Sequence, residues 1–94
     1  MDDTAKLIDF LCTRLDDEYE DTKTDLECQA DDAGIQRYGS RTLRDIEAKR
    51  RTLARCQEEM LSGIPRLVHF ATQTLKEMAL PYANYGSYRP EWRL

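Results

Sequence analysis

The side chains best suited to chemistry in this chain are three cysteines, one histidine and a dense set of carboxylates. Cys12, Cys28 and Cys56 are widely spaced and form no Cys-x-x-Cys pair, and His69 is the only histidine. A structural zinc site needs four such ligands with paired spacing. We therefore predict no metal site and no cofactor, and we interpret the cysteines as buried or half-buried residues in a reducing compartment.

Pairs of carboxylates on a helix can hold Mg²⁺, and two pairs in the first third of the chain have a suitable spacing. They are Asp17-x-x-Glu20 and Glu18-x-x-Asp21. A magnesium-dependent hydrolase needs a second acidic pair that faces the same cavity, and no such pair with apolar flanks follows. The sequence also contains no Glu-x-x-His, no Gly-rich phosphate loop and no nucleophile elbow. We therefore predict that the protein is not an enzyme.

Charge is strongly segregated along the chain. Residues 1–32 carry twelve acidic and three basic side chains, a net charge of −9, whereas residues 37–55 carry seven basic and two acidic ones, a net charge of +5. Helices that carry these charges would attract each other when packed antiparallel. The simplest interpretation is that the charge pattern favours one topology and otherwise forms solvated faces.

The acidic block also allows a functional interpretation. Its carboxylates could imitate a nucleic-acid backbone and occupy a protein site that normally binds phosphate. Under this hypothesis the chain is an acidic inhibitor of a complex that binds nucleic acid. The candidate residues are Asp16, Asp17, Glu18, Glu20 and Asp21.

The basic block could contact phosphate directly. Its arginines recur at spacings that place them on one face of a helix, and the candidates are Arg41, Arg44, Arg51 and Arg55. A nucleic-acid-binding domain is usually basic overall, however, and this chain has a net charge of −4 and a pI near 4.9. Direct nucleic-acid binding is therefore not the function that we expect.

The elements that must position these residues are helices. Apolar side chains recur in steps of three and four residues, which predicts helices over about 4–33, 41–61 and 64–80. Two glycines within residues 31–40 predict a connection, with Ser40 as the cap of the second helix. We expect a single all-α domain over residues 1–94, an antiparallel helical hairpin or three-helix bundle with coiled-coil-like seams.

The predicted first helix is longer than the other two. At 1.5 Å per residue the three helices would measure about 42, 32 and 26 Å, so the first would extend beyond its neighbours. Either this helix breaks near residues 22–24, or its end pairs with a second copy of the chain. We favour the homodimer, because the apolar steps persist as far as Leu26.

The last fourteen residues hold half of the aromatic side chains and are rich in proline and glycine, which predicts a non-helical tail. Such a tail either folds back as a lid on the bundle, which we favour, or extends to bind a partner. The partner-binding candidates are Tyr82, Tyr85, Tyr88, Glu91, Trp92 and Arg93.

The tail Leu80-Pro81-Tyr82-Ala83, with Tyr88 and Glu91-Trp92-Arg93, resembles that of a family of small actinobacterial and actinophage proteins of unknown function. Residues 43–51 and parts of residues 10–16 resemble the helices of that family. The insert and the histidines that family members carry are absent here. The resemblance implies no catalytic residue and implies a role in phage–host interaction or accessory regulation. It also implies that an acidic inhibitor of this kind would be phage-encoded and would act on a host or defence complex that binds nucleic acid.

The chain has no apolar run of about 18 residues and begins with acidic residues, so we expect neither a membrane span nor a signal peptide. The expected location is the bacterial cytoplasm. Together these features predict a helical protein–protein interaction module, with a protein partner of unidentified kind.

Overall fold

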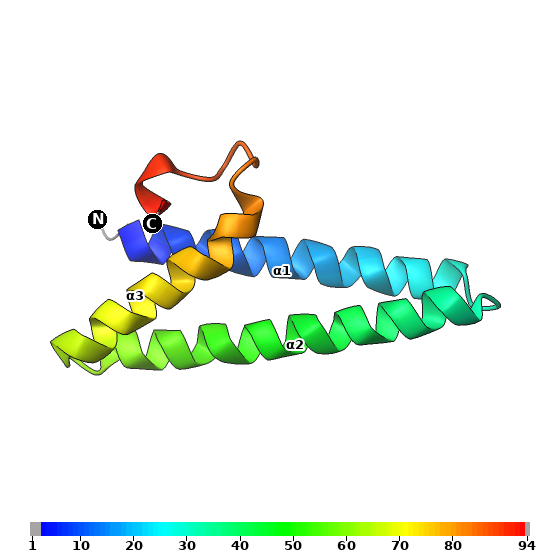
Figure 1. The fold of residues 1–94 in the computed structure, drawn as a ribbon, viewed down its shortest axis with the longest axis horizontal. Coiled ribbons are helices and arrows are strands. Elements are labelled where there is room, and N and C mark those ends of the chain that lie inside the picture. The colour runs from blue at the N-terminus through cyan, green and yellow to red at the C-terminus, as the bar shows by residue number, and fades with distance from the viewer. Residues whose placement is uncertain (1–2, 94) are drawn as a thin grey trace.

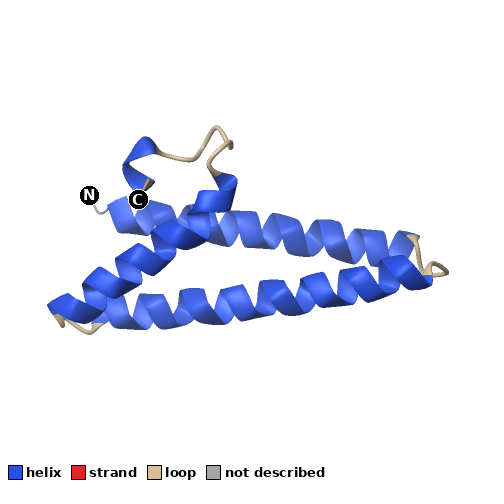
Figure 2. Cartoon of the chain, in the orientation of Figure 1, coloured by secondary structure: helices blue, strands red, loops and turns tan. Residues whose placement is uncertain are grey.

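The computed structural model describes residues 3–93, which form three α-helices and two short 3₁₀ helices and no strand. The α-helices are α1 (Asp3–Cys28), α2 (Ala33–Leu61) and α3 (Pro65–Ala79), and the 3₁₀ turns are η1 (Leu80–Tyr82) and η2 (Pro90–Trp92) (Figure 1; Figure 2). The predicted all-α bundle with an aromatic C-terminal tail is confirmed. The tail is not wholly irregular, because it contains the two 3₁₀ turns.

The bundle is an elongated hairpin with a third helix at one end. α1 and α2 run antiparallel along the longest dimension of a molecule that measures 50 × 27 × 19 Å. α3 crosses the hairpin beside the first half of α1 and the last half of α2 (Figure 1). Residues 16–45, which we call the distal hairpin, therefore form a two-helix segment.

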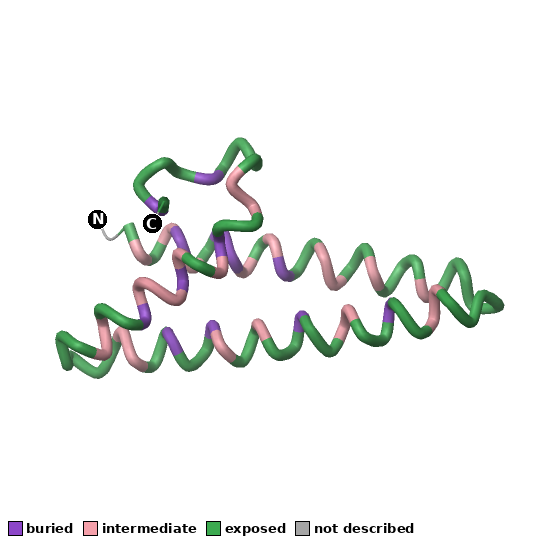
Figure 3. The backbone as a smooth tube through the Cα atoms, viewed as in Figure 1, coloured by how far each residue is buried: buried purple, intermediate pink, exposed green. Residues whose placement is uncertain are grey.

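The hydrophobic core lies where α3 crosses the hairpin. Its members are Leu7, Phe10, Leu11, Leu15, Ile46, Leu53, Cys56, Ala71, Leu75, Ala79, Tyr88 and Trp92. Little of the distal hairpin is buried (Figure 3). Gly39 is the one buried residue there, Tyr19, Leu26, Ile35 and Leu43 are half-buried, and Tyr38 is exposed. The fold thus has a well-packed part outside the distal hairpin, which we call the base, and a thin extension, the distal hairpin.

The connection predicted over residues 31–40 is in fact shorter and lies earlier, over residues 29–32, because α2 begins at Ala33. Asp32 is the N-cap, and its side chain accepts a hydrogen bond from the Ile35 amide at 3.0 Å. The Gln36 side chain donates to the Leu26 carbonyl at 2.8 Å and so satisfies the end of α1. Ser40, the predicted cap, lies inside the helix.

The two glycines that suggested a connection are inside α2, and Gly39 has a packing role there. A Cβ at Gly39 would lie 2.5 Å from Leu26 Cδ2, so the absence of a side chain lets α1 and α2 approach closely. Glycine in a helix costs about 1 kcal/mol relative to alanine. The close interhelical contact explains why the helix continues through a residue of low propensity.

α1 is one continuous helix that ends at Cys28, five residues before the predicted end and without a break near residues 22–24. Since α2 begins eight residues earlier than predicted, it covers the end of α1. The prediction that the first helix extends beyond its neighbours, from which we favoured a homodimer, is therefore wrong. A homodimer now has to be argued from the half-buried side chains of the distal hairpin.

The turn from α2 to α3 agrees with the sequence. Gly63 adopts a φ of +72°, a conformation that favours glycine, and Pro65 occupies the first turn of α3. The Ser62 hydroxyl donates to the Glu59 carbonyl at 2.6 Å. α3 ends one residue before the predicted position, where the chain tightens into η1.

Candidate functional site

The C-terminal tail folds back over the first half of α1. Trp92 is 2% exposed and Tyr88 is 8% exposed, and both rings pack around Phe10, with centroid separations of 5.1 and 6.0 Å. Phe10 lies off the core-facing stripe of α1, so it would be exposed without the tail. These two candidates are therefore buried within their own chain, as expected for a lid.

The other tail candidates are more accessible. Tyr82 is half-buried, Tyr85 is 47% exposed, and Glu91 and Arg93 are exposed. Tyr85 is not free, because the Arg14 guanidinium lies 4.5 Å from the centre of its ring. Most exposed side chains of the tail are polar or charged.

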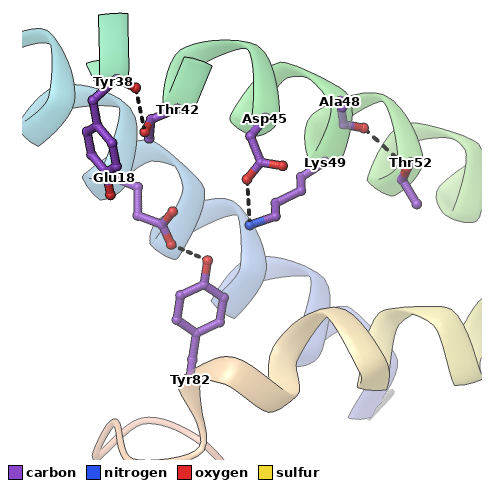
Figure 4. Close-up of polar contacts among 8 residues, drawn as sticks. All are labelled: Glu18, Tyr38, Thr42, Asp45, Ala48, Lys49, Thr52 and Tyr82. Carbon is purple, nitrogen blue, oxygen red and sulfur yellow. Dashed lines mark hydrogen bonds and ion pairs between the residues drawn. The ribbon is translucent and has the colours of Figure 1, made fainter. Parts of the chain in front are cut away.

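Tyr82 connects the tail to the acidic half of α1. Its hydroxyl donates a hydrogen bond to the Glu18 carboxylate, as the close-up shows (Figure 4). Burial raises the pKa of the Tyr82 phenol above its ordinary value, and the hydrogen bond to Glu18 and the charge of that carboxylate raise this pKa further. The phenol therefore stays protonated and remains a donor.

The acidic candidates do not form a uniform face. Asp16 pairs with Arg50 at 2.8 Å, Asp17 pairs with Arg14 at 2.8 Å, and Glu18 accepts from Tyr82. Glu20 and Asp21 are exposed and make no ion pair or hydrogen bond with the described residues. Three of the five predicted side chains therefore act within the chain.

Among the basic candidates, Arg51 pairs with Glu47 of its own helix at 2.8 Å. Arg41, Arg44 and Arg55 are exposed and have no ion pair in the described part of the chain. Their spacing places them on the side of α2 opposite the buried Ile46, although Arg44 also lines a pocket together with Tyr19 of α1. The basic face remains open.

Sequence reasoning missed the cation that joins the two helices. Arg50 is the one basic side chain of the described α2 that forms an ion pair with α1, and its guanidinium also lies 4.8 Å from the centre of the Tyr19 ring. Its position four residues after the core residue Ile46 was a usable signal, because that spacing turns the side chain towards α1.

The cysteines lack the features of a reactive site. Burial raises the pKa of the Cys12 thiol, as do the neighbouring carboxylates of Asp16 and Asp9, and burial also raises the pKa of the Cys56 thiol. Cys28 is exposed, contrary to prediction, because α1 ends there. Within residues 3–93 no group of three or more potential ligands is placed to hold a metal ion.

A comparison with known protein families finds a match to this chain. Residues 4–94 match the family of unknown function DUF6221. The chain belongs to DUF6221. No curated protein and no solved structure shows significant similarity to this chain.

The family description assigns DUF6221 no activity, so what this member does has to be inferred from its surface. The described helices include none that combines the length and apolar character needed to cross a membrane. The surface features from which its function can be inferred are therefore its open charged faces, its distal hairpin and its aromatic lid.

Proposed function

We propose that this chain is a non-enzymatic helical interaction module that pairs with a second copy of itself through the distal hairpin. The observation that supports this most is incomplete burial. Tyr19, Leu26, Ile35 and Leu43 are half-buried in α1 and α2, and α3 crosses at the other end of the hairpin (Figure 1). Two-helix segments are marginal alone, and a second hairpin packed against the first would complete a four-helix bundle.

The charges of the distal hairpin favour a second copy over an unrelated helix. On α1, Glu20, Asp21, Asp25 and Glu27 are exposed without an ion pair among the described residues. On α2, Arg37, Arg41 and Arg44 are likewise exposed and unpaired. A partner copy that placed its α2 beside α1 would bring unlike charges together along the whole segment.

The test is the mass in solution, measured by light scattering after size exclusion at low and high salt. We expect twice the 11.0 kDa chain mass at low salt, and partial dissociation at about 1 M salt, where the Debye length is about 3 Å. A monomer mass at low salt and high protein concentration would contradict the proposal.

Charge reversal tests the pairing itself. Arg41→Glu with Arg44→Glu should yield monomers, as should Glu20→Lys with Asp21→Lys, because each variant opposes like charges. Mixing the two variants should restore pairing. A matched control reverses Arg55 and Arg66, which are exposed outside the distal hairpin, and should dimerise normally. Failure of the mixture to pair, with both variants folded, would rule out the proposed contact.

The biological setting follows from the resemblance to small actinobacterial and actinophage proteins. It supports a role in phage–host interaction, in which the assembled module binds a host protein. Affinity capture from an actinobacterial lysate with the wild type and the Arg41/Arg44 variant tests whether that binding requires self-pairing. Capture by both proteins alike would separate partner binding from assembly.

The unpaired carboxylates Glu20, Asp21, Asp25 and Glu27 favour a second candidate, inhibition of a nucleic-acid-binding complex by charge mimicry. Because Asp16 and Glu18 are engaged within the chain, the informative variant replaces the four unpaired residues with Asn or Gln. Loss of competition with DNA for the complex would support mimicry. Equal competition by the neutral variant would exclude it.

A further inference from the structure

The hairpin of α1 and α2 has two broad sides, and the tail lies on one of them. η1 continues α3, and from η1 the Tyr82 side chain reaches α1 at Glu18 (Figure 4). Asp16 is two residues from Glu18, which turns it to the opposite side of α1, where it pairs with Arg50 of α2 at 2.8 Å. We call the side of Glu18 the tail side and the side of Asp16 and Arg50 the back face.

A groove lies on the back face, where the distal hairpin joins the base. Its volume is about 430 Å³, and it is lined by Tyr19, Leu43, Arg44, Glu47 and Arg50. Tyr19 and Leu43 are half-buried, so part of their apolar surface is still accessible. The core of a four-helix bundle is built from such side chains, which the facing helices contribute. Two copies packed on this groove would bring two tyrosines and two leucines into one layer.

One charge at the edge of this groove is unbalanced. Arg50 pairs with Asp16 of α1. Glu47 pairs with Arg51 of its own helix. Arg44, in contrast, is exposed and has no ion pair with the described residues. The groove therefore combines accessible apolar surface with one open positive charge, which a carboxylate from outside the chain would balance.

Glu20 has the matching charge but cannot reach Arg44 within one chain. It follows Asp16 by one helical turn, so it lies on the back face as well. It stands at the α1 edge of that face, beyond Tyr19, whereas Arg44 stands at the α2 edge with the groove between them. Glu20 is exposed and has no ion pair with the described residues. The back face thus carries an open negative charge at one edge and an open positive charge at the other.

The two open charges also lie at the same height along the hairpin. The register of α1 against α2 is fixed by the ion pair of Asp16 with Arg50 and by the close approach of Leu26 to Gly39. This register places Glu20 level with residues 45 and 46, within about 3 Å of Arg44 along the helix axis. A two-fold axis along the hairpin keeps these heights and places α1 of one copy over α2 of the other.

We infer that two copies pair back to back across this groove, with Glu20 of each copy against Arg44 of the other, and with Tyr19 and Leu43 of both copies in the layer between the two ion pairs. The inference rests on the proposed self-pairing and adds to it the face and the register. A second copy fits this face better than an unrelated helix, because it supplies the apolar layer and the missing carboxylate at the same height. The contact uses the same surface on both copies, so it closes as a dimer.

The first test exchanges the two charges and measures the dissociation constant of the dimer by sedimentation equilibrium. Glu20→Arg and Arg44→Glu should each weaken pairing at least about tenfold, because each change opposes like charges twice in the dimer. A chain with both changes restores the two ion pairs and should pair within about threefold of the wild type. Asp25→Arg is the control. Asp25 follows Glu18 by seven residues and so lies on the tail side, where this change should weaken pairing less than about threefold.

The second test compares the two sides of the hairpin. Tyr38 is 74% exposed and lines a groove with Thr22, which follows Glu18 by four residues, so Tyr38 is the competing apolar contact on the tail side. Leu43→Ala should weaken pairing at least about tenfold, and Tyr38→Ala less than about threefold. Thermal unfolding of each variant checks the fold, and the exposed Glu20 and Arg44 positions keep the test decisive if Leu43→Ala unfolds.

The outcomes separate this inference from the self-pairing on which it rests. A monomeric wild-type chain at high protein concentration overturns both. A wild-type dimer that tolerates Glu20→Arg and Arg44→Glu overturns the back-face contact and leaves self-pairing intact. Dissociation by Tyr38→Ala, with normal pairing of Leu43→Ala, overturns it in the same way and moves the contact to the tail side.

Discussion

At the scale of single residues, Gly39 is the position where packing overrides helix propensity. We expect Gly39→Ala to lower the free energy of unfolding by about 1 kcal/mol, because the added Cβ would overlap Leu26 by more than the propensity gain offsets. Urea denaturation measures this change. Ser40→Ala, at an exposed neighbouring position, should have little effect.

The sign of that change should depend on Leu26. In a Leu26→Ala background the overlap disappears, and Gly39→Ala should then stabilise the protein through its higher helix propensity. A double-mutant cycle therefore separates propensity from packing. If Gly39→Ala stabilised the wild-type chain as well, the close approach of α1 and α2 at Leu26 would not exist in solution.

Tyr82 provides a pH-dependent prediction at the same scale. Its phenol pKa is raised in the folded state, first by burial and then by Glu18, so the folded protein holds a proton that the unfolded chain loses above about pH 10. The stabilisation is fully present below that pH and is lost as the pH rises through the folded pKa. Tyr82→Phe should remove this dependence and cost about 1 kcal/mol at neutral pH.

The measurement is urea denaturation of wild type and Tyr82→Phe at several values between about pH 8 and pH 11. The two stability curves should converge as the pH rises. Tyr38→Phe is the control, because Tyr38 is 74% exposed, and its curve should parallel that of the wild type. A constant difference between wild type and Tyr82→Phe across this range would contradict a raised phenol pKa.

At the scale of elements, the tail behaves as part of the core. Trp92→Ala should cost about 3 kcal/mol and lower the Tm by more than about 10 °C, because a 2% exposed indole leaves a cavity against Phe10. Thermal unfolding followed by circular dichroism measures it. Tyr85→Ala, in the exposed part of the tail, should lower the Tm much less, and an equally small effect of Trp92→Ala would indicate a detached tail.

The helices and the turns between them show how much of the fold the sequence predicts. The steps of three and four apolar residues predict all three helices, and Gly63 with Pro65 predicts the turn between α2 and α3. The start of α2 escaped prediction because local glycine propensity opposes a helix that a distant residue, Leu26, makes favourable. Long-range contact decided that boundary.

The sequence indicates which residues make up the candidate site, but not how they are arranged. The aromatic tail is visible in the sequence, yet the same residues suit a lid or an extended partner-binding segment. The deciding residue is Phe10, which stands off the core stripe of α1 and is buried by Trp92. A pocket beside it is lined by Lys6 and Arg89, which are 83 residues apart in a 94-residue chain. No local pattern brings them together.

At the scale of the whole molecule, the uneven distribution of the core predicts uneven stability. The base holds nearly all the buried side chains, whereas the distal hairpin buries only Gly39 among the described residues. Local opening costs little where few apolar contacts are lost. Amide hydrogen exchange, read by mass spectrometry on peptic fragments, should therefore be faster in residues 16–45 than in the helical segments of the base.

Self-pairing adds a second expectation to the same measurement. If two copies pair through the distal hairpin, raising the protein concentration at low salt should slow exchange in residues 16–45 and leave the base and the lid unchanged, because pairing buries Tyr19, Leu26, Ile35 and Leu43. The Arg41→Glu, Arg44→Glu variant should show fast exchange at every concentration. If exchange slowed in the tail instead, the contact between the two copies would lie at the lid. The charges of the distal hairpin would then stabilise only the fold of a single chain.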